Sequence, residues 1–279
     1  MSEKIRMICP VCGSSLTKKD KSFVCPSRHS FDIARQGYVN LLPVQNKHSL
    51  APGDAKDMLQ ARRRFLDKEY YRPICDDVIG MMKQYTSRND PVLVDIGCGE
   101  GYYTAAFEKY GGAECIGVDI AKDAARMACA RSKSILWTVA TASHLPVESG
   151  SADIVTAIFS LYMNDEYARI LKNGGIVIEV TAGSDHLKEL KEMIYDEVFE
   201  QHKCPSPHGM QFEEIAKLNR DFQIKLDKEE LKELLLMTPH VHRMKKERIE
   251  ILDKTESCTL TVNYIIRVLR KNEERNSNE

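Results

Sequence analysis

Apolar residues change their spacing at about residue 91 of the 279-residue chain. Ahead of that point they recur at helical intervals after Asp54, the expected N-cap, and again over residues 72–86, which predicts two helices. Beyond it, short apolar runs alternate with helical stretches. The expected strands and helices are Val92–Ile96, Gly101–Lys109 (helix), Glu114–Ile120, Lys122–Arg131 (helix), Ile135–Val139, Ile154–Phe159 and Ile176–Val180. This alternation predicts an α/β fold with a doubly wound, mainly parallel sheet.

The C-terminal part carries weaker signals. Helices are expected at Asp185–His202 and Lys228–Met237, and a β-rich run at Thr259–Leu269 precedes a polar tail, residues 271–279, expected to be disordered. The longest run without Asp, Glu, Lys or Arg, Ser134–Val147, has fourteen residues. A membrane-spanning helix needs about 20 mostly apolar residues. Since no apolar stretch of signal-peptide type follows the charged N-terminus, a cytoplasmic protein without membrane contact is expected.

Three of the nine cysteines crowd into the first 25 residues. Cys9, Cys12, Cys25 and His29 form the pattern C-x2-C-x12-C-x3-H, which can supply the four ligands of a tetrahedral zinc ion. Four protein ligands leave no open coordination position, so the predicted site is structural. A redox Cys-x-x-Cys pair is the alternative, but no thioredoxin-like βαβ unit surrounds it. Residues 1–35 are therefore expected to form a small zinc-binding, ribbon-like domain.

Charge is distributed unevenly, although the net charge of the chain is only −1. Residues 1–72 carry 14 Lys and Arg against 7 Asp and Glu, and residues 73–279 carry 26 against 34. A basic front part and an acidic remainder favour different partners. RNA phosphates suit the basic part, and a chance asymmetry of solvated surfaces is the alternative. The candidate phosphate-contacting side chains are those of Lys18, Lys19, Lys21, Arg62, Arg63 and Arg64.

A glycine-rich loop follows the first expected strand and reads Asp95-Ile96-Gly97-Cys98-Gly99-Glu100-Gly101. Its glycines let the backbone turn sharply and approach a ligand closely. The second expected strand ends near Asp119, which can accept hydrogen bonds from ribose hydroxyls. A dinucleotide-binding fold would show G-x-G-x-x-G. The loop here is G-x-G-x-G with an acid ending its strand, which favours S-adenosylmethionine (SAM) over the two alternatives, NAD and a purely structural turn.

With both motifs placed, the chain closely resembles the bacterial 23S ribosomal RNA (rRNA) guanine-N1 methyltransferases of the RlmA/RrmA family. The likeness runs from about Cys9 to about Val268. Its most specific stretches are Cys25-Pro-x-x-His29-x-Phe31-Asp32 with Gly37–Gln45, Pro52-Gly53-Asp54 with Met58, Ala61-Arg62-Arg63 and Phe65-Leu66-Asp67, then Asp95–Thr104 and Leu236-Met237-Thr238-Pro239.

The resemblance implies a zinc domain held by Cys9, Cys12, Cys25 and His29, and a class I SAM-dependent methyltransferase domain of Rossmann-like fold. We expect the latter over residues 91–270, with residues 36–90 as linker and helices. The resemblance also implies a homodimer whose cleft takes an RNA hairpin. It implies SAM contacts from four further residues besides the loop, so that the complete predicted cofactor set is Tyr71, Asp95, Gly97, Gly99, Glu100, Gly101, Tyr103, Thr104, Asp119 and His186.

The expected reaction moves the SAM methyl group to N1 of a guanine in a hairpin loop of 23S rRNA. That nitrogen carries a proton, which a carboxylate could remove, but motif and spacing assign no particular residue. The base has to leave its loop and stack on an aromatic side chain, for which Tyr162 is the candidate. Two alternatives stay open: a SAM-dependent enzyme for a small molecule, and an RNA-binding protein that binds SAM without turnover.

Overall fold

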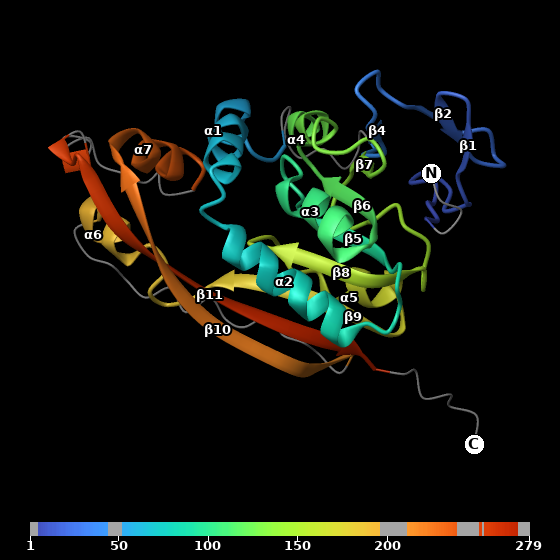
Figure 1. The fold of residues 1–279 in the computed structure, drawn as a ribbon. Helices are drawn as coiled ribbons and strands as arrows, with labels where there is room; N and C mark the ends of the chain where they lie inside the picture. The colour runs from blue at the N-terminus through green and yellow to red at the C-terminus, as the bar shows by residue number, and fades with distance from the viewer. Residues whose placement is uncertain (1–4, 44–51, 196–210, 239–250, 253, 273–279) are drawn as a thin grey trace.

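The computed structural model describes residues 5–43, 52–195, 211–238, 251–252 and 254–272. An eight-stranded sheet occupies the centre of the molecule, in the order β10-β11-β9-β8-β5-β6-β7-β4 (Figure 1). Strands β4 to β9 pair in parallel, and β11 pairs antiparallel with both β9 and β10. The strands are β4 (Val39–Asn40), β5 (Val92–Ile96), β6 (Glu114–Asp119), β7 (Leu136–Val139), β8 (Ala152–Ile158), β9 (Leu171–Ala182), β10 (Phe212–Asp227) and β11 (Ser257–Lys271).

The predicted doubly wound sheet is confirmed. From β5 the chain first builds outward through β6 and β7, and then returns to build β8 and β9 on the other side. Every residue of β5, β7 and β8 is buried, because helices or other segments cover both faces, and such strands appear as continuous apolar runs in the sequence. The order reverses between β5 and β8, and ligands of open α/β sheets bind at the carboxyl ends of strands at this point.

Seven helices accompany the sheet in the described parts of the chain. They are α1 (Lys56–Asp67), α2 (Arg72–Tyr85), α3 (Tyr102–Gly111), α4 (Lys122–Ala128), α5 (Asn164–Ile170), α6 (Lys188–Ile194) and α7 (Lys228–Leu236). The prediction of Asp54 as N-cap was wrong. Ala55 occupies that position without a side-chain cap, because the Asp54 carboxylate pairs with the Arg62 guanidinium instead. None of the described helices is long and apolar enough to cross a membrane.

The long antiparallel pair of β10 and β11 was only half predicted. The two strands pair from Phe212↔Lys271 to Asp227↔Ser257, and they extend beyond the other strands of the sheet toward α7 (Figure 1). β11 was expected, although shorter, because it is rich in buried apolar residues. β10 was not, because most of its side chains are exposed and polar. The predicted helix over 185–202 begins at Lys188, and its part beyond residue 195 lies outside the described residues, as does the tail 273–279.

The N-terminal unit is a three-stranded antiparallel sheet of β1 (Thr17–Lys19), β2 (Ser22–Val24) and β3 (Ser30–Asp32). It lies beside the β4 edge of the large sheet (Figure 1). Met7 forms a β-bridge with Val147, and the buried Phe23 belongs to the same apolar cluster as Val147. Residues 36–90 were expected to be linker and helices, yet Val39–Asn40 joins the large sheet as its edge strand. The small unit is therefore fixed against the large one by backbone pairing as well as by apolar contact.

Candidate metal centre and cofactor site

The four ligands predicted for zinc converge in the N-terminal unit. Their ligand atoms all lie within 4.8 Å of one another. The sulfurs of Cys12 and Cys25 are 3.7 Å apart, and Nδ1 of His29 lies 3.4 Å from the Cys25 sulfur and 3.6 Å from that of Cys9. Tetrahedral zinc, with bonds of about 2.3 Å to sulfur and 2.0–2.1 Å to nitrogen, needs edges of about 3.8 Å between two sulfurs and about 3.6 Å between sulfur and nitrogen. The donor set therefore fits zinc, with Nδ1 as the histidine ligand atom.

Two tight turns bring the ligands together. In the first, the Gly13 amide donates to the Cys9 carbonyl at 2.8 Å, with Gly13 at φ +71°. In the second, the Arg28 amide donates to the Cys25 carbonyl at 2.9 Å, with Arg28 at φ +65°. The left-handed residue in each turn reverses the chain, so that both ligands of a pair face one point.

The two cysteines of the first turn differ in the pKa of their thiols. Hydrogen bonds from Ser14 lower the pKa of Cys12 to about 5, so this thiol is already a thiolate near neutral pH. Burial raises the pKa of Cys9, which keeps that thiol protonated without a metal. Thiolate is the form that binds metal. Zinc binding is therefore coupled to the release of a proton from Cys9.

The predicted phosphate-contacting residues fall into two groups. Lys18, Lys19 and Lys21 are exposed on the hairpin of β1 and β2, where an external anion can reach them. The arginines of α1 face acceptors of the protein itself instead. Arg62 Nη1 donates to Asp54 at 2.5 Å, Arg63 Nη1 to the Met127 carbonyl at 3.4 Å, and Arg64 Nε to Glu233 at 2.6 Å. A role in RNA contact, which stays a prediction for all six, would compete with these bonds in the arginines.

The glycine-rich loop joins β5 to α3 and lies at the switch point of the sheet. At two of its glycines, no other residue type would fit. Gly97 has φ +70°, and a Cβ there would lie 2.1 Å from Ser160 Oγ. Gly101 has φ +89°, and its Cβ would lie 2.8 Å from the Trp137 ring. Left-handed backbone and close neighbours both require glycine. The loop is thereby pressed against the residues that follow β8.

Asp95 lies near the carboxyl end of β5 and is buried. Its two oxygens accept hydrogen bonds from the hydroxyls of Thr104, at 2.5 Å, and Thr156, at 2.7 Å. Burial raises the pKa of Asp95 to about 6, and the two hydroxyls oppose that rise. Thr104 is therefore placed to orient Asp95, and its hydroxyl is occupied in this arrangement.

Asp119 ends β6, as predicted, and lies beside the glycine loop. One carboxylate oxygen accepts the Gly99 amide at 2.8 Å, and the other accepts the Ala121 amide at 2.8 Å. Burial raises its pKa, and the two amides lower it. Each carboxylate oxygen can accept more than one hydrogen bond, so Asp119 retains acceptor capacity for a pair of ribose hydroxyls.

Glu100 was predicted as a cofactor contact, but the structure directs one of its oxygens elsewhere. Glu100 Oε2 accepts the Arg131 guanidinium at 2.7 and 2.8 Å, and Arg131 also pairs with Asp67 of α1. This buried pair ties the glycine loop to the end of α4 and to α1. The other oxygen, Oε1, is buried and has no hydrogen-bond partner among the described residues, so contact with SAM stays a prediction for that atom.

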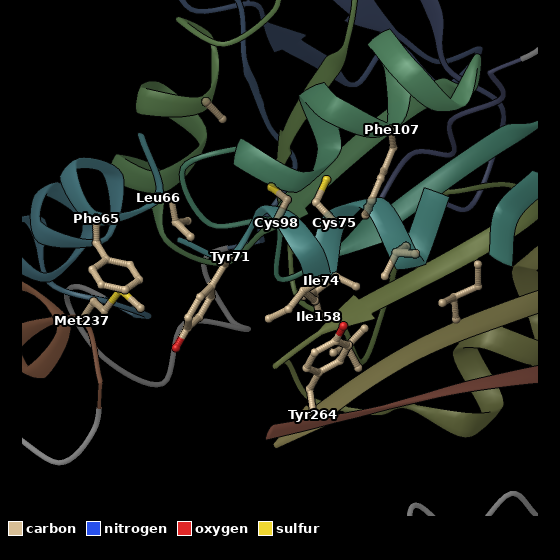
Figure 2. Packing of buried hydrophobic residues seen from close by; sticks show 14 of the residues in the cluster. Phe65, Leu66, Tyr71, Ile74, Cys75, Cys98, Phe107, Ile158, Met237 and Tyr264 are labelled. Atoms are coloured by element: carbon tan, nitrogen blue, oxygen red, sulfur yellow. The ribbon is translucent and has the colours of Figure 1, made fainter. Parts of the chain in front are cut away.

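Tyr71 and His186 lie 115 positions apart in the sequence and meet in space. Their ring centroids are 6.3 Å apart, and the Phe159 ring lies 6.3 Å from Tyr71 and 5.6 Å from His186. His186 Nδ1 lies 2.8 Å from the Asn263 carbonyl, which can only accept, so Nδ1 carries a proton. Figure 2 shows the Tyr71 ring at the start of α2, directed away from the helix, between Phe65 and Ile158.

The Tyr103 hydroxyl is a further polar group that a ligand could use. It is buried and has no hydrogen-bond partner among the described residues, and burial raises its pKa. A buried hydroxyl without a partner is unfavourable. With the spare acceptors of Asp119 and Glu100, this donor adds to the unused polar groups around the switch point, and the residues present therefore fit SAM.

Sequence reasoning missed two features of this site. Arg62 bridges Asp54, the Met237 carbonyl at 3.2 Å and the neighbourhood of Gly99, which joins α1, α7 and the glycine loop. Phe159 packs against the rings of Tyr71 and His186 at the edge of the site. Arg62 was predicted as an RNA contact, but nothing local in the sequence links Arg62 or Phe159 to the cofactor site.

Comparisons with known proteins agree with this geometry. Residues 7–50 match the family model of a zinc ribbon described as "RlmA, N-terminal", and residues 94–178 match "Methyltransferase domain". A protein of Bacillus subtilis, "Putative 23S rRNA (guanine-N(1)-)-methyltransferase YxjB", is 30% identical over 92% of this chain and 94% of its own length. The "23S rRNA (guanine(748)-N(1))-methyltransferase" of Streptomyces fradiae is 31% identical over 92% of this chain and 95% of its own length.

The sheet order, the glycine loop and the zinc ribbon define the class of protein as a SAM-dependent methyltransferase with an added zinc-binding domain. SAM is the cofactor that this methyltransferase domain implies, and the Cys and His cluster of the ribbon indicates zinc. More narrowly, the chain belongs to the family of 23S rRNA (guanine-N1)-methyltransferases that these relatives represent.

Proposed function

We propose that this chain transfers the methyl group of SAM to N1 of a guanine in a hairpin loop of 23S rRNA. The observation that carries the proposal is a likeness over 92% of the chain to relatives named for N1 methylation of 23S rRNA guanine. The likeness includes the zinc ribbon as well as the methyltransferase domain, so it extends beyond what methyltransferases in general share.

SAM, when bound, supplies an activated methyl group, which leaves positioning and desolvation to the protein. Asp119 would accept the ribose hydroxyls, since it ends β6 with spare acceptor capacity. Asp95, oriented by Thr104 and Thr156, would hold a negative charge beside the glycine loop. Tyr71 and His186 would enclose the cofactor on the side of the ring group. In the transfer, the guanine N1 would lose its proton to a carboxylate or to water, and it would form its new bond to the methyl carbon as the bond from that carbon to the sulfonium sulfur breaks, which leaves a neutral thioether.

The zinc ribbon would serve the RNA. We assign it to residues 1–35, with residues 36–90 supplying α1 and α2 and residues 91–270 the methyltransferase domain. Lys18, Lys19 and Lys21 are exposed on the ribbon, and lysines that neutralise phosphates contribute affinity independent of sequence. We also propose a homodimer that acts in the cytoplasm, where a ribosomal substrate is made. Light scattering at several protein concentrations tests the dimer.

Mass spectrometry of 23S rRNA fragments from cells with and without this protein tests the reaction. One guanine should gain about 14 Da, the mass of one methyl group in place of one hydrogen, as expected for a cofactor that donates methyl. Reverse transcription should stop at the same base, because N1 lies on the Watson–Crick edge. Transfer of label from SAM to a small molecule but never to rRNA would favour a small-molecule enzyme. Binding of SAM and RNA without any transfer would favour an RNA-binding protein.

A further inference from the structure

Phe159 is the first residue after β8 and holds an unusual conformation. Its backbone has φ +50°, in the left-handed region, which is unfavourable for a residue with a large side chain. The residue is nevertheless 41% exposed, so burial does not compensate for that conformation. Backbone strain of this kind concentrates at functional sites and persists only where the surroundings enforce it.

The surroundings of Phe159 do enforce it. The Phe159 amide donates to the Val180 carbonyl of β9 at 2.9 Å. The next residue, Ser160, lies so close to Gly97 that a Cβ on that glycine would come within 2.1 Å of Ser160 Oγ. Phe159 is thus fixed to the sheet, and the residue after it to the glycine loop. The ring is held in place where the carboxyl ends of β5 and β8 meet.

The ring of Phe159 also lies at the edge of the proposed cofactor site. It packs against His186 at 5.6 Å with the planes 38° apart, and against Tyr71 at 6.3 Å with the planes 46° apart. Tyr71 is only 4% exposed. Phe159 is therefore the outer member of this group of three rings, with part of its surface open to a ligand beside the cofactor.

We propose that Phe159 is the platform on which the acceptor guanine stacks during methyl transfer. This inference rests on the proposed function and specifies its base-binding site. A guanine taken out of its loop needs a π surface in place of its lost neighbours. An aromatic ring held rigidly next to the cofactor provides that surface with little loss of conformational entropy on binding.

Tyr162, the stacking residue predicted from the sequence, is placed differently. Its ring packs edge-on against Tyr167 at 5.0 Å, and it belongs to an apolar cluster that also contains Val155 and Val177. Its hydroxyl is buried, and burial raises its pKa. The side chain of Tyr162 therefore packs within the apolar cluster. The side chain of Phe159, three positions earlier, remains exposed to a ligand.

The test compares Phe159→Leu with Phe159→Trp and with Tyr110→Leu. Tyr110 is the matched control, because it is also 41% exposed but lies at the far end of α3. Phe159→Leu should lower kcat/KM for a 23S rRNA stem-loop about 5- to 150-fold, the range for one lost base–aromatic stack. SAM affinity, measured by calorimetry, should change by less than about threefold, which is within 0.7 kcal/mol. Phe159→Trp should keep most of the activity, and Tyr110→Leu should match the unmodified protein.

A second stem-loop, abasic at the modified position, separates stacking from other causes. If Phe159 stacks on the target base, Phe159→Leu and the unmodified protein should bind this RNA equally well. Weaker binding of the abasic RNA by Phe159→Leu than by the unmodified protein would overturn the proposal. A loss of SAM affinity equal to the loss in kcat/KM would also overturn it. If the unmodified protein transfers no methyl to rRNA, the proposed function fails. Normal transfer by Phe159→Leu would leave that function intact and refute only the stacking role.

Discussion

The zinc ribbon and the cofactor site are built in opposite ways. All four zinc ligands lie between Cys9 and His29, a span of 21 residues closed by two turns. The cofactor site draws on α2, on the ends of β5, β6 and β8, and on His186 beyond β9. Ligand spacing along the chain therefore determines the first site, whereas the topology of the sheet determines the second.

The zinc ribbon and the methyltransferase domain also differ in what stabilises them. The ribbon strands are three residues long, and β1 is exposed throughout, so this unit has little apolar surface to bury and small units of this kind depend on metal. The large sheet has continuous buried strands covered by helices. The ribbon should therefore depend on its metal ion for folding, and the methyltransferase domain should fold without any ligand.

The largest expected effect follows from removal of one zinc ligand. Cys12→Ser should release zinc and unfold the ribbon, because structural zinc contributes about 10–16 kcal/mol in small zinc-binding units. SAM affinity should change by less than about threefold, or 0.7 kcal/mol, because the cofactor site shares no residue with the cluster. Zinc content measured with a chromogenic chelator and SAM titration by calorimetry check the two parts. Cys258→Ser, a half-exposed thiol of β11 outside the cluster, is the control and should keep its zinc.

The comparison between the two regions would fail if Cys12→Ser abolished SAM binding while the methyltransferase domain stayed folded. The bridge between Met7 and Val147 and the buried Phe23 are the contacts through which such coupling would have to act. Circular dichroism of the variant would establish whether the large domain is intact.

A second prediction acts on the other region. Asp119→Ala should weaken SAM binding about 10- to 150-fold, since one lost charge-assisted hydrogen bond is worth roughly 1.5–3 kcal/mol. It also removes the acceptor of the Gly99 amide, which loosens the glycine loop. Zinc content should be unchanged. Asp123→Ala, on the neighbouring α4, where the carboxylate pairs with Arg126 at 2.8 Å, is the control and should bind SAM normally. Binding of NADH in place of SAM would contradict the cofactor assignment.

The strands that are buried on both faces of the sheet could be predicted from the sequence. Val92–Ile96 was predicted with its observed bounds, because all five residues are buried and Asp95 alone interrupts an apolar run. β10 was missed, because most of its side chains are exposed and its apolar residues alternate only near its end, at Phe222, Ile224 and Leu226. Its conformation is decided by pairing with β11, which lies well beyond it in the chain.

The same contrast holds for the candidate sites. Zinc ligands and loop glycines could be predicted because their chemistry requires those residue types at short spacings. Tyr71 and His186 were placed only through the family resemblance, since nothing local in the sequence links them. The pairing of Asp54 with Arg62 and the conformation of Phe159 arise from packing between α1, α7 and the strand ends, which no local pattern encodes.

A third prediction tests whether the ribbon contacts RNA. Reversing the charges of Lys18, Lys19 and Lys21 to Glu should weaken binding of an rRNA stem-loop and flatten its salt dependence by about one unit of slope per lost phosphate contact. SAM affinity should stay the same, because the hairpin of β1 and β2 lies beyond the β4 edge of the sheet, away from the switch point. The measurement is stem-loop affinity across a salt series. Equal slopes for the two proteins would mean that the lysines only solvate the ribbon.

The smallest expected effect is a change of stability and of SAM affinity with pH, which should arise in the cofactor site and not in the zinc ribbon. Burial raises the pKa of Asp95 from 3.8 to about 6, so ionisation of this group opposes folding, and its contribution to stability rises as the pH falls through 6. SAM binding should show the reverse trend. Its cationic amino group favours the ionised carboxylate, so affinity should fall by at most about tenfold per pH unit below 6.

Thr104→Val sharpens this last prediction. The Thr104 hydroxyl donates to Asp95 at 2.5 Å and lowers its pKa, so its removal should move the midpoint of the SAM-binding profile to higher pH. Burial also raises the pKa of Asp119, but Thr104 donates to Asp95, so a shifted midpoint identifies Asp95 as the titrating group. Calorimetric titrations of SAM between pH 5 and 8, a range that covers about one unit below to two units above the raised pKa, are the measurement. An unchanged midpoint would exclude Asp95 as the titrating group.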